Sequence, residues 1–228
     1  QSDAILVTAR RGPDSPANDQ SIAVVPNVEG TLDIRNEWNA LGFRGTCSEG
    51  FLLEAEGDVE QIFPTPYADI SAQTMLPTSH LLWSSVWLGI ATSAVDKARA
   101  LVRRDARKSV GSTPQAAVHL ANLVAVLEQF RALVHTAAAD YESVSDDVEA
   151  LSSIGFALRM NSLKVSSSTL VVDVVGQAMS ICGMAGYKED SQFSLGRSLR
   201  DAYGAALMVN NDRLLNASAQ MLLVHKGS

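Results

Sequence analysis

Residues 80–102 read HLLWSSVWLGIATSAVDKARALV, and this stretch decides the fold of the larger part of the chain. Leucine or valine recurs along it every seven residues, with alanines between. These positions are Leu81, Leu88, Val95 and Val102, with Ala91 and Ala98 between them. Such a period places the side chains on one face of an α-helix, so the pattern predicts a helix with a buried stripe. A stripe of this kind more often packs in a core than binds a cofactor, and we interpret it as helix packing.

A second helix is predicted after a break at residues 111–114. Thr113 is placed to cap this helix and Pro114 to occupy its first position, where a missing N–H costs little. Its apolar stripe comprises Leu120, Val124, Leu127, Val134, Ala138 and Tyr141.

Two further helices complete the pattern. The third is predicted from 148 to about 181, after a capping cluster at 143–147, and it ends at Gly183 and Gly186. The fourth is predicted from about 194 to 224. Short connections between long helices favour antiparallel neighbours, so residues 76–228 are predicted to form an antiparallel four-helix bundle.

The N-terminal part has the signature of β-structure. Short β-branched or alternating runs flank turn-forming segments, at residues 4–9, 21–25, 32–38 and 50–55. Pro64, Pro66 and Pro77 are interpreted as the linker out of this part. The fold class is therefore α+β, with a partial antiparallel β-domain at 1–75. The chain begins directly in a strand-like run without Met, so we expect a fragment, a nicked chain or one half of a split protein.

Composition excludes several classes of function. The net charge is −7 and the most basic stretch, 99–108, is interrupted by Asp105, so we expect no nucleic-acid partner. Cys47 and Cys182 lie far apart and are interpreted as free thiols in a reducing cytoplasm. The histidines show no metal-ligand spacing. No apolar run approaches the roughly 20 residues of a membrane span, and no signal peptide is visible, so we expect a cytoplasmic protein.

One polar cluster interrupts an otherwise apolar helix pattern. Asn210, Asn211 and Asp212 are consecutive, and their side chains disfavour helix interiors. The cluster indicates a local kink or a ligand contact. Nearby, Arg200 and Asp201 are interpreted as members of a structural ion pair.

Four segments together resemble the acyl-CoA dehydrogenase family in order and spacing. They are NALGFRGT at 39–46, WLGIA at 87–91, GMAGY at 183–187 and RSLRDA at 197–202. The first is similar to the family's W-x-x-L-G-(M/F)-R-G-(S/T), the third to G-G-x-G-Y and the fourth to R-x-x-R-D-A. Each segment alone is weakly specific, but the set in register covers essentially the whole chain.

The resemblance implies a fold, a cofactor and a reaction. An N-terminal helical domain and the first β-strands would be supplied by a missing segment or a partner chain, in a homo- or hetero-oligomer. FAD would lie between the β-domain and the helices, with its pyrophosphate reaching a neighbouring subunit. The usual reaction is α,β-desaturation of an acyl thioester, carried by CoA or a carrier protein. A glutamate takes the α-proton while a hydride goes to flavin N5.

The sequence departs from the family at the base. By the resemblance, the usual glutamate falls at Val209 and the family's alternative base at Ser79. Neither side chain can take an α-proton at neutral pH without a partner base. Asp212, three residues beyond Val209, is the nearest candidate for the base, and the catalytic residue is otherwise unknown.

The resemblance also suggests cofactor-binding residues. Arg104 would contact the FAD pyrophosphate, Gln115 is in step with a family glutamine, and Gly183 and Gly186 would let backbone approach the phosphates. Asn211 is a further candidate for the cofactor site. The structural alternatives are a helix-end cation for Arg104 and a helix C-cap for the two glycines.

Three functions remain open from the sequence. The first is an FAD-dependent acyl-thioester dehydrogenase whose base lies elsewhere. The second is a non-catalytic subunit of a heteromeric dehydrogenase. The third is a flavin monooxygenase of the same fold, for which loss of the glutamate would be expected.

Overall fold

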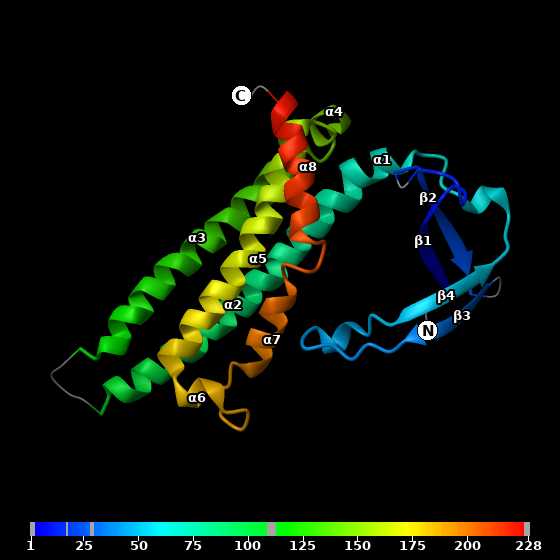
Figure 1. Cartoon of the computed structure of the whole chain (residues 1–228). Helices are drawn as coiled ribbons and strands as arrows, with labels where there is room; N and C mark the ends of the chain where they lie inside the picture. The colour runs from blue at the N-terminus through cyan, green and yellow to red at the C-terminus, as the bar shows by residue number, and fades with distance from the viewer. Residues whose placement is uncertain (1–2, 17, 28–29, 109–112, 226–228) are drawn as a thin grey trace. The chain divides into compact units, whose positions relative to one another are not determined.

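The computed structural model describes residues 3–16, 18–27, 30–108 and 113–225 (Figure 1). The chain forms two compact units. The first consists of Gln1–Ala40 and Arg44–Met75, and the second of Leu41–Phe43 and Leu76–Ser228. The short segment Leu41–Phe43 therefore belongs with the helices, although it lies between two strands of the first unit in sequence.

The first unit contains two antiparallel strand pairs. Strands β1 (Ala4–Arg10) and β2 (Gln20–Pro26) form one, and β3 (Gly30–Asn36) and β4 (Gly50–Ala55) form the other. The four predicted strands are confirmed, and each observed strand end lies within two residues of the predicted one. Among the described residues of this unit, Ile22 is the one hydrophobic side chain in the buried class. The first unit thus has little core of its own.

The helical part begins earlier than predicted. Helix α1 (Tyr67–Ile70) leads through a π-helical turn (Ser71–Met75) into α2 (Leu76–Ala106), whereas the sequence predicted that the bundle begins at 76. The interpretation of Pro77 as part of the linker was wrong, because it is the second residue of α2. Pro77 directly follows the π-helical turn at Ser71–Met75, where the regular hydrogen-bond pattern of the α-helix is already interrupted. The predicted stripe from Leu81 to Val102 is buried, as expected.

The core lies between α2, α3 (Gln115–Val144) and α5 (Ile154–Cys182), which run side by side in Figure 1. Helix α2 packs most extensively against α5. The largest apolar side chains of the core include Trp87 and Val95 of α2, Leu123, Leu127 and Phe130 of α3, and Phe156, Met160 and Leu163 of α5. Two details of α3 were predicted wrongly. Pro114 is the N-cap, in place of Thr113, and Ala137 is buried where Ala138 was expected.

The third predicted helix is interrupted near its start. A single turn, α4 (Val148–Leu151), precedes α5, and each of the two helices has an N-cap residue whose side chain accepts a backbone hydrogen bond. Asp147 accepts a hydrogen bond from the N–H of Ala150 at 2.9 Å, and Ser153 accepts one from Phe156 at 3.2 Å. Gly183 ends α5 as predicted, and the short helix α6 (Met184–Tyr187) follows.

The fourth predicted helix is two helices. Helix α7 (Gly196–Gly204) and α8 (Asn211–Val224) are separated by a turn at residues 205–210. The side chain of Asn210 accepts hydrogen bonds from the N–H groups of Asp212 and Arg213, so it starts a new helix as an N-cap. The kink expected from the polar cluster is confirmed, and the continuous helix is not. The α+β class, a small antiparallel part followed by a helical bundle, is confirmed.

Helices α3 and α5 are long and apolar enough to cross a membrane by length and composition. In their most apolar windows, 22% and 39% of the residues are buried in the described structure. Core helices of soluble proteins pass the same test, so the expectation of no membrane span stays a prediction.

Candidate functional site

The turn between α7 and α8 contains a strained residue. Val209 has a φ of 46°, in the left-handed region that β-branched residues rarely adopt. Such a conformation costs on the order of 1–3 kcal/mol and persists only where the surroundings hold it. Backbone bonds close the turn around it, including Asn211 N–H to Ala206 O at 3.1 Å.

Lys164 of α5 holds this turn from inside the bundle. Its side chain is fully buried, and Nζ donates to Val209 O and to Asn211 Oδ1, both at 2.7 Å. Asn211 Nδ2 in turn donates to Ser168 Oγ at 3.0 Å. Burial lowers the pKa of Lys164 to about 8, so the ammonium form predominates at pH 7. The ammonium group also lies 5.6 Å from the ring centroid of Trp87.

A row of aromatic rings leads from Lys164 to the segment Leu41–Phe43. Trp87 stacks on Trp83 with 5.9 Å between ring centroids, and Trp83 lies 5.9 Å from Phe43. The Phe43 N–H donates to Asp201 Oδ1 at 2.8 Å. Gly204 permits this contact, because a Cβ there would overlap the Phe43 ring. The row therefore links α2, α7 and Leu41–Phe43 to the turn that carries Val209.

Residues 200 and 201 do not pair with each other. Arg200 Nη1 forms an ion pair with Glu189 Oε1 at 2.6 Å, whereas Asp201 binds the backbone of Phe43. The predicted ion pair between them was therefore wrong: Arg200 pairs with another carboxylate, and Asp201 accepts a hydrogen bond from a backbone N–H.

Helices α2 and α5 bury several polar side chains besides Lys164. These are His80 and Ser84 of α2 and Asn161, Ser167 and Ser168 of α5. Burial lowers the pKa of His80 to about 4, and the charge of Lys164 adds to this effect, so the imidazole is neutral at pH 7.

The predicted base positions carry no carboxylate. Val209 is 38% exposed, and Ser79 shares a face of α2 with the exposed side chains of Leu82 and Val86. Asp212 is exposed in the first turn of α8, where a carboxylate favours the helix dipole. The exposed face of α2 around Ser79 is therefore partly apolar, whereas Val209 is followed by the polar cluster at 210–212.

The structure brings four of the five predicted cofactor residues to one end of the bundle. Arg104 lies near the end of α2, Gln115 begins α3, and Gly183 and Gly186 follow α5, and these helix ends lie together in Figure 1. Asn211 lies apart from them, with its side chain directed to Lys164 and Ser168.

Arg104 is already engaged at this end of the bundle. Its Nε donates to Asp105 Oδ1 at 2.9 Å, which raises the pKa of Arg104, and its guanidinium lies 5.0 Å from the Phe193 ring centroid. Gly183 is the C-cap of α5, and its φ of 54° is a conformation that favours glycine. Whether these residues contact FAD stays a prediction.

A pocket of about 240 Å³ lies between α3 and α5 and was not predicted from the sequence. His119, Asn122, Gln177, Ser180 and Ile181 line it. His119 and Asn122 follow Gln115 by four and seven residues, so the three share one face of α3. That spacing is the signal that could have revealed the pocket.

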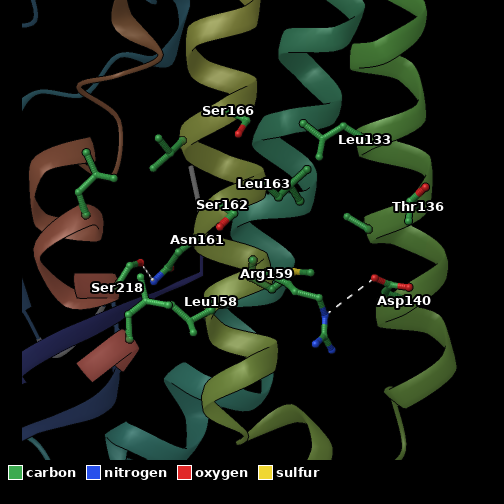
Figure 2. Close-up of a pocket in the computed structure, with 15 residues that line it drawn as sticks. Leu133, Thr136, Asp140, Leu158, Arg159, Asn161, Ser162, Leu163, Ser166 and Ser218 are labelled. Carbon is green, nitrogen blue, oxygen red and sulfur yellow. Dashed lines mark hydrogen bonds and ion pairs between the residues drawn. The ribbon is translucent and has the colours of Figure 1, made fainter. Parts of the chain in front are cut away.

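A larger groove of about 550 Å³ runs along α5 between α3 and α8 (Figure 2). Its lining is mostly apolar. Two polar contacts cross it, from Asn161 Nδ2 to Ser218 Oγ at 3.1 Å and from Arg159 Nε to Asp140 Oδ2 at 3.9 Å. No sequence motif pointed to this groove.

Comparison with known proteins identifies the family of this chain. Residues 71–208 match the C-terminal domain of acyl-CoA dehydrogenases, which is more than half of the chain. The chain belongs to the acyl-CoA dehydrogenase family, as the resemblance implied. The comparison with curated protein sequences finds no match.

The solved structures that share this fold are named as enzymes of different reaction types. Butyryl-CoA dehydrogenase from Megasphaera elsdenii matches 97% of this chain and 56% of its own, with 19% identity and a TM-score of 0.76. The flavoprotein nitroalkane oxidase matches 99% of this chain and 56% of its own, with 20% identity and a TM-score of 0.76. Dibenzothiophene monooxygenase from a Paenibacillus species matches 100% and 62%, with 21% identity and a TM-score of 0.68. This chain thus spans less than two thirds of each, and the likeness establishes the fold.

Proposed function

We propose that the chain is the C-terminal part of an FAD-dependent oxidoreductase whose reaction does not begin with proton removal by residue 209. Val209 carries this proposal, because a hydrocarbon side chain accepts no proton. Ser79, at the family's alternative base position, has a hydroxyl that would itself need a base. Ser79 also shares a face of α2 with the exposed apolar side chains of Leu82 and Val86.

Monooxygenation fits this arrangement better than desaturation. Desaturation of an acyl thioester needs a base within hydrogen-bond reach of the α-proton. Monooxygenation places one oxygen atom of O₂ on the substrate and releases the other as water, with electrons that FAD supplies when reduced and bound. The dibenzothiophene monooxygenase has the same fold. The role of this chain would be to bind and orient an apolar substrate and to exclude water from it.

The pocket between α3 and α5 combines polar side chains with apolar surface, which suits the nucleotide end of FAD. His119, Asn122, Gln177 and Ser180 offer hydrogen-bonding groups for ribose, adenine or phosphate oxygens. Gly183, next to the pocket in sequence, has no atom within 4 Å of the place where a Cβ would lie, so its backbone is open to approach. These residues would hold the cofactor and take no part in the redox step.

Cofactor binding is the first test. The full-length protein should purify with FAD or bind it when added, as measured by visible absorbance and fluorescence. Asn122→Leu should weaken FAD binding about tenfold by removing a hydrogen-bonding group worth about 1.4 kcal/mol. Gln129→Leu, exposed on the same helix outside the pocket, is the matched control and should bind FAD normally.

The reaction is the second test. With acyl-CoA thioesters of several chain lengths and an artificial electron acceptor, we expect no turnover. With reduced flavin, isotope-labelled O₂ and an apolar aromatic heterocycle, we expect labelled product. Rapid acyl-CoA desaturation would overturn the preference for monooxygenation. Failure of the full-length protein to bind FAD would instead favour a subunit without chemistry of its own.

A further inference from the structure

Lys164 donates one hydrogen bond to Val209, the strained residue of the α7–α8 turn, and another to Asn211. An apolar side chain could fill the same space without the cost of burying an ammonium group. The charge is therefore explained by what it binds, which is the carbonyl oxygen of Val209 and the side chain of Asn211. Asn211 is held a second time by Ser168, so the acceptor is itself fixed.

Val209 would not retain its backbone conformation unaided. Left-handed φ values are unfavourable for β-branched residues. Backbone hydrogen bonds close the turn around Val209, from Met208 N–H to Gly204 O and from Asn211 N–H to Ala206 O, but those bonds do not hold its own carbonyl group. The bond from Nζ to Val209 O fixes the peptide group that follows the strained residue. The direction of the Val209 side chain follows from that peptide orientation.

We propose that Lys164 is a positioning residue: its buried ammonium holds the backbone of Val209 and thereby fixes where the side chain at position 209 lies in the reaction site. The inference rests on the proposed function in one respect, that position 209 faces the flavin and substrate. The clamp on the turn itself stands on the contacts of this chain alone.

Hydrogen–deuterium exchange of the full-length protein tests the clamp. Lys164→Met should raise amide exchange in residues 204–213 about tenfold or more while exchange in α3 stays unchanged. Ser167→Ala is the matched control, because Ser167 is also buried on α5 but its Oγ has no hydrogen-bond partner in the described structure. That variant should exchange like the wild type throughout.

A second substitution separates positioning from simple packing. Asparagine adopts left-handed conformations more readily than valine does, so Val209→Asn should relieve the strain that Lys164 holds. In the Val209→Asn background, Lys164→Met should raise exchange of the turn by less than about threefold. An equal factor in both backgrounds, or no effect of Lys164→Met at all, would refute the proposal. If Lys164→Met does not fold, Asn211→Ala removes one acceptor of the same clamp and is measured instead, with the same two expectations.

The visible spectrum of bound FAD tests the link to the reaction site. Lys164→Met should shift the flavin absorbance and change its fluorescence, and Ser167→Ala should not. If FAD binds but its spectrum is the same in all variants, the placement of position 209 at the flavin is wrong. If the wild type binds no FAD, the proposed function fails, while the exchange experiment still decides the clamp.

Discussion

Asp212 is the carboxylate nearest to Val209 along the chain, and its surroundings are those of a helix terminus. Its side chain is exposed in the first turn of α8, and its N–H is capped by Asn210 at 2.9 Å. A carboxylate there stabilises the helix by about 0.3–1 kcal/mol. These features explain the residue without a catalytic role.

Asp212→Asn should therefore leave flavin-dependent turnover within about tenfold of the wild type, less than about 1.4 kcal/mol of activation free energy. The melting temperature should fall slightly. Steady-state kinetics and thermal denaturation of the full-length protein check both. A thousandfold loss of turnover with normal folding and flavin content would instead identify Asp212 as the base.

His80 makes stability depend on pH in the acid range. Its pKa is about 4 in the folded chain, mainly because of burial, against about 6.5 for an unfolded histidine. Between these values the unfolded chain binds the proton and the folded chain does not. Stability from this group is complete above pH 6.5 and is lost as the pH falls toward 4.

Urea unfolding at pH 7 and pH 4.5 measures this effect. The wild type should lose about 2–3 kcal/mol more than His80→Leu over that interval, because the variant has no imidazole to titrate. Carboxylates titrate equally in both proteins, so the difference isolates His80. Equal losses would mean that the imidazole is protonated within the fold.

Lys164 shows what a single sequence does not reveal at the residue scale. A lone lysine on a helix is expected to be solvated, and nothing near residue 164 in the sequence marks it otherwise. Its partners, Val209 O and Asn211, lie 45 and 47 residues away. The polar cluster at 210–212 was visible because its residue types conflict locally with a helix. Long-range burial of a charge has no local signature.

At the scale of the elements, two glycines at the end of the third predicted helix and in its interior should respond oppositely to alanine. A Cβ at Gly186 would lie 2.6 Å from Cys182 Cβ, whereas one at Gly176 meets nothing within 4 Å. Gly186→Ala should destabilise the protein by about 1–3 kcal/mol through overpacking. Gly176→Ala should stabilise α5 by about 0.5–1 kcal/mol, because alanine is the better helix former. Chemical denaturation of both variants decides, and equal effects would contradict this account.

The helices that were predicted well are those whose own residues specify them. The seven-residue stripe of α2, the Asp147 cap of α4 and the Gly183 stop of α5 are local signals with local physical causes. The polar cluster predicted a kink at 210–212, but not that the chain leaves the helix already at 205, because Ala205 and Ala206 favour a helix. Lys164 and the Asn210 cap, whose partners are known only from the structure, stabilise the turn.

For the whole molecule, exposed apolar side chains on the helical unit favour self-association. Leu215, Leu222, Leu223 and Val224 of α8 are each more than half exposed. Burying such side chains stabilises an interface by about 25 cal/mol per Å² of apolar surface. We predict that the full-length protein is at least a dimer that buries part of the helical surface. Light scattering should show this, and a monomer at high protein concentration would disprove it.

Because Leu41–Phe43 belongs to the helical unit, the coding sequence of that unit is discontinuous. The chain passes between the two compact units at 40/41, 43/44 and 75/76. A contiguous coding segment that contains the whole helical unit therefore also encodes strand β4 of the first unit. A recombination that joined residues 76–228 to a foreign N-terminus would leave out the ring that packs on Trp83 and covers Gly204. Exchange of this bundle between genes therefore costs that aromatic contact, about 0.5–1.5 kcal/mol, unless the incoming sequence brings a ring to the position of Phe43.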